Sequence, residues 1–223
     1  MGYGAIWGTV DWPQNTDLPK HHLSQRYVAA SHMIGALPIG TLPDEPNFKA
    51  AIFCSLPSDG YSSWQNAGRD AWKAKTTALW PALAPFVNQI TDPDQMTMAQ
   101  YSLGTLKCLY NNRLVHIGDA AHCASPQLGQ GANMALLDEL ALSRALASHP
   151  IAQALPAYAR ARGLHTKIYQ AMSWAFTPMY QSNSKILPIL RDRVLFPVSQ
   201  IPPMPHILTS LVCGTMVSPM QRL

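Results

Sequence analysis

The first part of the chain alternates between short apolar segments and turn-forming residues. Residues 3–10, 25–39 and 49–56 are rich in β-branched and aromatic side chains, and Pro, Gly and Asp residues separate them. This pattern of residues is typical of β-strands bounded by turns. We therefore expect three strands of one sheet in this region.

The pattern then changes to a helical one. From residue 64 to 79, apolar and small side chains recur at steps of three and four positions, and Pro81 follows. Such spacing predicts a helix that covers the sheet and ends before the proline. Trp64, Trp72 and Trp80 fall on or near one side of it, which favours core packing over a stacking platform for a ligand.

The second part of the chain is dominated by helical patterns. Residues 96–103, 107–110 and 113–117 are expected to form further short strands, the last running directly into a glycine turn. Apolar positions at steps of three and four predict a buried helix over residues 131–148 and a second helix over 153–174. Strands followed by helices predict an α/β (α+β) fold.

This pattern divides the chain into three expected parts. Residues 1–110 form the sheet with its covering helix, residues 111–150 the glycine turn and its helix, and residues 151–223 the C-terminal helices with a proline-rich tail. No internal repeat or low-complexity segment interrupts them.

Composition excludes several classes of protein. Charged residues make up only 13% of the chain against 48% hydrophobic ones, which argues against disorder and against a coiled coil. The 16 Lys and Arg residues against 12 Asp and Glu give a net charge of +4, and the basic residues are dispersed rather than gathered into a stripe. Nucleic acid is therefore not an expected partner.

Cysteine spacing and hydropathy indicate a cytoplasmic protein without a membrane span. Residues 1–12 lack the features of a secretory signal, and five prolines interrupt the apolar tail over residues 194–220. The four cysteines have no paired spacing, which is typical of reduced thiols rather than of disulfides or a zinc site. They are Cys54, Cys108, Cys123 and Cys213.

The segment from residue 113 to 146 carries the clearest chemical signal. Asp119 follows the predicted strand at once, where its carboxylate can accept hydrogen bonds from sugar-like hydroxyls. Gly129 and Gly131 bracket the start of the long helix and let a ligand approach the backbone. The unpaired amides of residues 130–133 lie at the positive end of the helix dipole, which favours an anion.

This segment resembles the second flavin-contact motif of the para-hydroxybenzoate hydroxylase-like FAD-dependent aromatic monooxygenases. The family pattern is GDAAH, a proline, and GxGxN at a helix start, and residues 118–122, Pro126 and residues 129–133 match it in register. The resemblance implies cofactor-binding roles for Gly118, Asp119, Pro126, Gly129, Gln130, Gly131, Ala132 and Asn133. Weaker similarity extends over residues 4–40 and 158–182.

The resemblance implies a role for each part of the motif. Asp119 would contact the ribityl hydroxyls, the loop at Pro126 would lie against the isoalloxazine ring, and the amides of residues 131–133 would face its N1 and O2 edge. Negative charge at that edge of reduced flavin would be stabilised by a helix N-terminus by about 1 kcal/mol.

The implied activity is hydroxylation of an aromatic or related small organic substrate by FAD with NAD(P)H and O2. Since the cofactor performs the oxygen chemistry, no catalytic side chain is expected. The substrate would lie between the flavin and the sheet, where Trp7, Arg26, Tyr27 and Met33 are candidates to line the pocket.

The sequence also departs from the family pattern. It contains neither the GxGxxG loop that binds the ADP half of FAD nor the Asp-Gly motif of such enzymes. The chain thus resembles the C-terminal portion of a monooxygenase. The alternative is a truncated or non-catalytic flavoprotein module that needs a separate ADP-binding chain, and a flavin halogenase or related oxidase is a weaker third. A homodimer and a complementary N-terminal part both stay open as partners.

Two other chemistries are disfavoured. His122 and Cys123 could form a nucleophile pair, but adjacent residues on an extended chain point to opposite faces, and no acid is spaced to orient the histidine. His21, His22 and His32 have no cysteine or acid at ligand spacing, so no metal site is expected.

Overall fold

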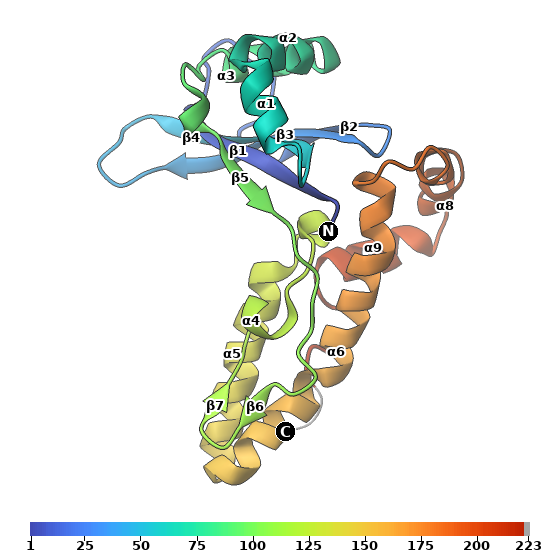
Figure 1. Ribbon diagram of the computed structural model, residues 1–223. Coiled ribbons are helices and arrows are strands. Elements are labelled where there is room, and N and C mark those ends of the chain that lie inside the picture. The colour runs from blue at the N-terminus through green and yellow to red at the C-terminus, as the bar shows by residue number, and fades with distance from the viewer. Residues whose placement is uncertain (221–223) are drawn as a thin grey trace. The chain divides into compact units, whose positions relative to one another are not determined.

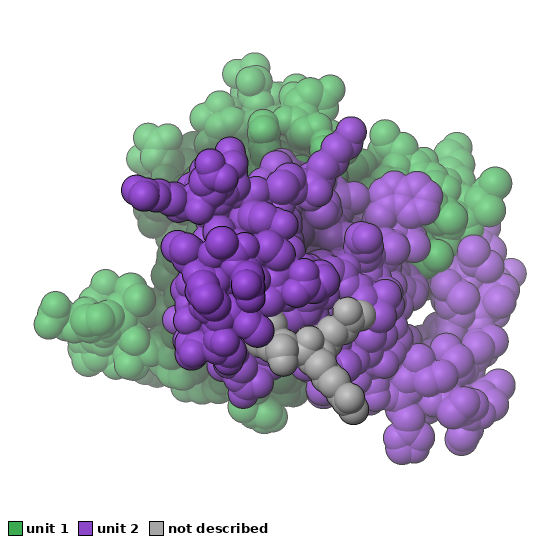
Figure 2. Space-filling view, turned by 90° about the horizontal axis from the view of Figure 1, so that it is seen from below, with its two compact units in different colours: residues 1–101, 179–188 green, residues 102–178, 189–223 purple. Residues whose placement is uncertain are grey.

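The computed structural model describes residues 1–220. The chain divides into two compact units, which Figure 2 distinguishes by colour. Unit 1 comprises residues 1–101 and 179–188, and unit 2 comprises residues 102–178 and the chain from residue 189 onward. The three-part division expected from the sequence stays a prediction.

Unit 1 is built on a five-stranded antiparallel sheet (Figure 1). Its strands lie in the order β2-β3-β4-β1-β5. They are β1 (Tyr3–Asp11), β2 (Ser24–Val28), β3 (His32–Thr41), β4 (Phe48–Pro57) and β5 (Thr97–Gln100).

The register of the sheet separates its two faces. Ile6 pairs with Cys54, which in turn pairs with Ile34, and all three side chains belong to one buried apolar cluster. Trp7 pairs with Phe53 one position along and therefore lies on the opposite face, because successive side chains alternate. The sheet thus has one face packed into the core and a second face with its own aromatic residues.

Short helices cover the core face of the sheet (Figure 1). They are α1 (Tyr61–Ala67), α2 (Arg69–Leu79), the 3₁₀ turn Pro81–Leu83, α3 (Ala84–Val87) and the 3₁₀ turn Pro93–Gln95. The single helix predicted from residue 64 is two helices, because Gly68 between them has a φ of 84°. A side chain rarely adopts that backbone conformation, so glycine permits the break.

Aromatic and aliphatic side chains from the helices fill the core of unit 1. Phe86 and Leu83 are fully buried, and the ring of Trp12 packs edge-on against Phe86 with 5.2 Å between centroids. Burying side chains of this size stabilises a fold by about 1.5–3 kcal/mol each. The predicted packing role of Trp64 and Trp72 agrees with their burial in the same cluster.

A segment distant in sequence completes unit 1. The backbone N–H of Ser182 donates to the carbonyl oxygen of Ala30 at 2.9 Å, and the hydroxyl of Tyr3 donates to Oδ1 of Asn183 at 2.5 Å. Residues 179–188 are therefore tied to the sheet by both backbone and side-chain contacts.

Unit 2 begins with small elements and continues with two long helices. In chain order these are β6 (Tyr110–Asn111), β7 (Leu114–Val115), α4 (Asp119–His122), the 3₁₀ turn Pro126–Leu128, α5 (Gly131–Ser148) and α6 (Ile151–Tyr180). The C-terminal elements are α7 (Leu187–Leu190), the π-helical turn Arg191–Leu195, α8 (Phe196–Ser199) and α9 (Met204–Val212). The last residues of α6 and the first of α7 belong to unit 1.

Helices α5 and α6 pack closely along their small residues. Ala141 and Ala145 of α5 form a buried cluster with Ala154, Ala157 and Tyr158 of α6. Because alanine side chains are short, the two backbones can approach each other, and the ring of Tyr158 fills the remaining space. The buried helix predicted over residues 131–148 is confirmed.

The predicted α/β class is confirmed, but several local predictions were wrong. The strand predicted over residues 25–39 is the β2–β3 hairpin, whose turn includes Ala29 with a φ of 53°. The predicted strands at 107–110 and 113–117 are reduced to two strands of two residues each. The proline-rich tail, for which no individual element was predicted, contains helices after residue 186. In the described part of the chain, no helix is both long and apolar enough to cross a membrane.

Candidate functional site

The loop before α5 and the first turn of that helix form a backbone-lined surface in unit 2. Gly129 adopts a left-handed conformation with a φ of 63°, which glycine tolerates best. A Cβ atom added at Gly131 would meet no atom within 4 Å, so open space lies beside the first turn. The first amides of a helix lack intrahelical acceptors, and no side chain caps those of α5.

Most of the motif residues are exposed on this surface. Asp119 is the first residue of α4 rather than a loop residue, and its carboxylate forms no hydrogen bond or ion pair within residues 1–220. Pro126, Gly129, Gly131 and Ala132 are likewise exposed. Acidic and backbone donor groups are therefore available to a ligand here.

Gly118 differs from the other motif residues because it is buried. Its φ is 56°, and a Cβ atom there would lie 3.1 Å from Cβ of Ala135. Its backbone N–H donates to Oδ2 of Asp138 at 2.9 Å. Gly118 thus allows the loop to lie against α5, beneath the exposed surface.

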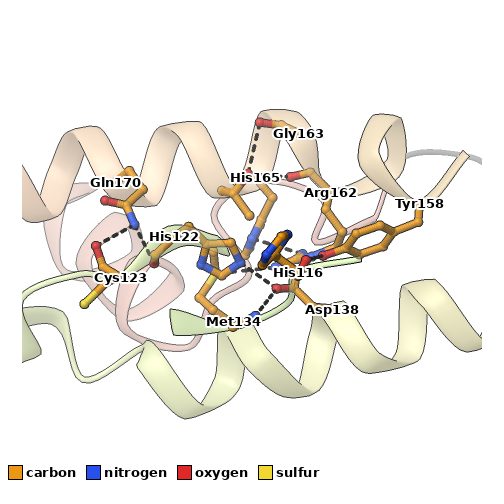
Figure 3. A network of polar contacts seen from close by, with 12 residues as sticks. His116, His122, Cys123, Met134, Asp138, Tyr158, Arg162, Gly163, His165 and Gln170 are labelled. Carbon is orange, nitrogen blue, oxygen red and sulfur yellow. Dashed lines mark hydrogen bonds and ion pairs between the residues drawn. The ribbon is translucent and has the colours of Figure 1, made fainter. Parts of the chain in front are cut away.

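Asp138 is the centre of a buried network that holds this loop (Figure 3). Oδ2 also lies 2.5 Å from Nε2 of His122, and Oδ1 lies 2.7 Å from Nε of Arg162. Burial alone would raise the pKa of Asp138, but the hydrogen bonds from His122, Arg162 and Gly118 together outweigh it and lower the pKa. Asp138 is therefore buried in its ionised form.

Arg162 and His165 extend the network toward the C-terminal segment. Nη1 of Arg162 lies 3.3 Å from Nδ1 of His165, and it also donates to the carbonyl oxygen of Pro219. Nε2 of His165 donates to the carbonyl oxygen of Gly214 at 3.0 Å. A guanidinium requires an acceptor at Nδ1 and a carbonyl requires a donor at Nε2, so the geometry defines a neutral imidazole with its proton on Nε2. Burial lowers the pKa of His165 accordingly.

A second set of hydrogen bonds fixes the segment after α4 to α6. Nε2 of Gln170 donates to the carbonyl oxygens of His122 and Cys123, at 2.6 and 3.1 Å. The backbone N–H of Ser125 donates to Oγ of Ser173 at 3.1 Å. The loop that carries the motif is therefore held at several points by side chains of α5 and α6.

The side chains of Gln130 and Asn133 form hydrogen bonds within the protein. Nδ2 of Asn133 donates to Oε1 of Gln130 at 2.8 Å, and Nε2 of Gln130 donates to the carbonyl oxygen of Val212. These contacts tie the first turn of α5 to the end of α9. What Gln130 and Asn133 offer a ligand is consequently their backbone.

A small cavity of about 20 Å³ lies behind the surface, lined in part by Asp119, Ser125 and Gly131. The hydroxyl oxygen of Ser125 is buried and has no hydrogen-bond partner among the described residues. This volume is too small to enclose a ring system. A ligand would instead lie over the exposed glycines, and the free carboxylate, the open space at Gly131 and the uncapped amides fit a flavin there.

The candidate substrate residues belong to unit 1 and do not share one face of the sheet. Tyr27 pairs with Met33, and both lie on the same face as Trp7, whose ring stacks on Phe53 with 4.5 Å between centroids. Arg26 pairs with Ile34 and therefore lies on the face that the helices cover, at the exposed edge strand. Their roles stay predictions.

The residues of the buried network were not predicted from the sequence, although the position of Asp138 among apolar residues of α5 could have indicated them. Met134, Asp138, Ala141 and Ala145 are the buried positions of α5, so the acid falls within an otherwise apolar stripe. A carboxylate at such a position requires buried partners. The expectation that no acid orients His122 was wrong, because Asp138 lies beside it; the thiol of Cys123 instead donates to the carbonyl oxygen of Ser102 at 3.4 Å.

The histidines considered as metal ligands do not gather with others. Among residues 1–220, no group of three or more His, Cys, Asp or Glu residues is arranged to hold a metal ion. The rings of His21 and His22 pack against each other, and Nδ1 of His32 lies 2.9 Å from Oγ of Ser31.

Comparison with known proteins identifies the class. Residues 56–165 match the family model of the FAD binding domain. The matched segment contains residues 118–133, and the resemblance of those residues to the FAD-dependent aromatic monooxygenases is confirmed. FAD is the cofactor of this domain.

The relatives that match in sequence share only a segment with this chain. Kynurenine 3-monooxygenase of Salinispora tropica is 46% identical over 67 residues, which is 30% of this chain and 15% of that protein. 2-Heptyl-3-hydroxy-4(1H)-quinolone synthase of Pseudomonas aeruginosa is 42% identical over 62 residues, 28% of this chain and 16% of that protein.

Solved structures share the fold over most of the chain. Klebsiella pneumoniae HpxO complexed with FAD and uric acid aligns with a TM-score of 0.72 and 16% identity, over 96% of this chain and 53% of that one. A mutant of 2-methyl-3-hydroxypyridine-5-carboxylic acid oxygenase aligns with a TM-score of 0.63 and 19% identity, over 79% and 46%. The chain therefore spans about half the length of these structures.

Proposed function

We propose that the chain acts in an FAD-dependent monooxygenase that hydroxylates an aromatic or related small organic substrate with NAD(P)H and O2. The observation that carries the proposal is the exposed backbone surface at the start of α5, held rigidly by the buried network around Asp138. That surface coincides with the flavin-contact motif and lies within the matched family segment.

Each exposed motif residue has a role toward the cofactor in this proposal. The carboxylate of Asp119 would accept hydrogen bonds from the ribityl hydroxyls, and the loop at Pro126 would lie against the ring. The amides of Gly131, Ala132 and Asn133 would face the N1 and O2 edge, where the helix dipole stabilises negative charge by about 1 kcal/mol. When bound, FAD supplies the oxygen-activating chemistry, and the protein orients the reactants and excludes water.

The relatives and unit 1 both support the proposed substrate class. The names of these proteins and complexes refer to kynurenine, a quinolone, uric acid and a pyridine carboxylic acid, which are all small ring compounds. Trp7, Tyr27 and Met33 share the sheet face opposite the covering helices, and flat apolar side chains suit stacking against such rings. We propose that this face contacts the substrate.

A flavin module that works with a separate ADP-binding part is the second candidate. The observation that favours it is the lack of a GxGxxG fingerprint among these 223 residues. In that arrangement unit 2 would contact the flavin and ribityl part, while the adenosine diphosphate would be bound elsewhere.

The test compares flavins that differ in their adenosine part. The purified chain is mixed with FAD, FMN or riboflavin, and binding is measured by quenching of flavin fluorescence. Because the proposed contacts involve only the isoalloxazine and the ribityl chain, the three flavins should bind with similar affinity, and ADP should not compete. Failure to bind any flavin, or competition by ADP, would contradict the proposed site. Turnover is then measured as substrate-dependent NAD(P)H oxidation, with an ADP-binding partner chain added in parallel.

A further inference from the structure

Unit 1 contains a large cavity that the proposed function does not use. It has a volume of about 510 Å³ and lies between the core face of the sheet and helices α1 and α2. Ile6, Ile34 and Cys54 line it from the sheet, and Trp64 and Trp72 line it from the helices. Its size falls within the range of small-molecule sites, about 300–1,000 Å³.

The two tryptophans that line the cavity have buried indole donors without acceptors. Trp64 and Trp72 are only 8% and 7% exposed, and neither indole N–H has a hydrogen-bond partner among the described residues. An indole nitrogen can only donate, and leaving a buried donor unpaired costs about 1–3 kcal/mol. The thiol sulfur of Cys54 lies beside the indole of Trp72, and sulfur is only a weak acceptor.

The edge of the cavity carries a cation, Lys75, that an anionic ligand can contact. Lys75 of α2 lines the cavity, is exposed, and forms no ion pair within residues 1–220. Burial and then the nearby Lys75 lower the pKa of His32, so the imidazole is neutral near pH 7 and Lys75 is the cation in this part of the described lining. Asp59 is the acidic residue in the lining, and it is exposed to solvent.

We propose that this cavity binds an apolar monocarboxylate, with its ring or chain against the tryptophans and the sheet, and its carboxylate at Lys75 and the indole N–H of Trp64. The site is separate from the flavin surface, whose residues all belong to unit 2. Of the proposed substrate face, Met33 also lines the cavity, whereas Trp7 lies on the other side of the sheet from Ile6 and does not line it.

The experiment uses 2-naphthoate as the probe and its neutral analogue 2-naphthalenemethanol. Titration calorimetry measures affinity, and the indole N–H resonances of the ¹⁵N-labelled full chain report the location, with the Trp64 signal assigned from a Trp64→Phe variant. We expect naphthoate to move the Trp64 signal downfield and to leave the Trp7 signal unchanged. A shift of the Trp7 resonance alone, or no shift of any indole resonance, would overturn the proposal. This readout uses the wild-type chain and therefore does not depend on whether a variant folds.

Three variants separate the contributions. Lys75→Gln should weaken naphthoate binding by about tenfold and leave the alcohol unaffected, because it removes only the charge contact. Lys73→Gln is the matched control on the same helix, since its ammonium contacts the carbonyl oxygen of Asn88 instead. Ala71→Trp, at an exposed position of the lining, should block both compounds without changing flavin binding. Equal affinity in Ala71→Trp and the wild type would contradict the site.

Discussion

Nε2 of His122 lies 2.5 Å from Oδ2 of Asp138, although the two residues belong to different helices and are both buried. The same carboxylate accepts from the backbone N–H of Gly118 and from Nε of Arg162 (Figure 3). One side chain of α5 therefore fixes both ends of α4 and connects α5 to α6. The exposed motif residues owe their arrangement to this buried charge.

Replacing that charge should destabilise unit 2 strongly. In Asp138→Asn, the guanidinium of Arg162 stays buried without a counter-charge, and breaking such a pair costs about 3–5 kcal/mol. Chemical denaturation measures the loss in the free energy of unfolding. Glu139→Gln, the exposed neighbour, is the control and should change it by less than about 0.5 kcal/mol. Equal stability of both variants would remove Asp138 from the centre of the network.

The stability of unit 2 should fall as the pH falls below the ordinary pKa of histidine. The folded protein lowers the pKa of His165, so the unfolded chain binds a proton first, and stability present above about pH 6.5 is lost below it. Protonation would place Nδ1–H against the guanidinium of Arg162. His165→Gln can keep a donor and an acceptor but cannot titrate. Its free energy of unfolding should therefore decline less between pH 7.5 and 5.5, and a parallel decline would refute this role.

Asp119 should matter for flavin binding and not for folding. Its carboxylate is exposed and has no partner within the described residues, so Asp119→Ala removes no internal contact. Loss of hydrogen bonds from the ribityl hydroxyls to a charged acceptor should weaken riboflavin binding by about tenfold. Fluorescence titration measures the affinity, with Glu139→Ala as the control for loss of a surface charge. Unchanged affinity in Asp119→Ala would exclude the ribityl contact.

The sequence predicted the elements whose signals are local. The helix at residues 131–148 follows from its own apolar period and from Gly129 before it, and the exposed backbone at its start follows from the two glycines. The flavin motif was recognisable because its chemistry depends on backbone conformation, which glycine and proline spacing encode within a few positions.

The buried network depends on contacts between distant residues, and no local pattern specifies those. Asp138 is far in sequence from Arg162, and only the packing of α5 on α6 brings them together. The hairpin at Ala29 was missed because a positive φ at alanine gives no turn signal in the sequence. The helices of the tail were missed because proline usually indicates the end of a helix, whereas α8 and α9 have proline in their first turns.

The central claim, that a flavin contacts the backbone at the start of α5, is tested most directly by a pair of glycine variants. A Cβ atom meets no atom within 4 Å at Gly131 or at Gly163 in the middle of α6, so alanine at either position should leave the free energy of unfolding unchanged or raise it by up to about 1 kcal/mol. Gly131→Ala should weaken riboflavin binding by about tenfold or more, because the methyl group occupies the space beside the amides. Gly163→Ala should bind as the wild type does. Wild-type affinity in a folded Gly131→Ala variant would contradict the account.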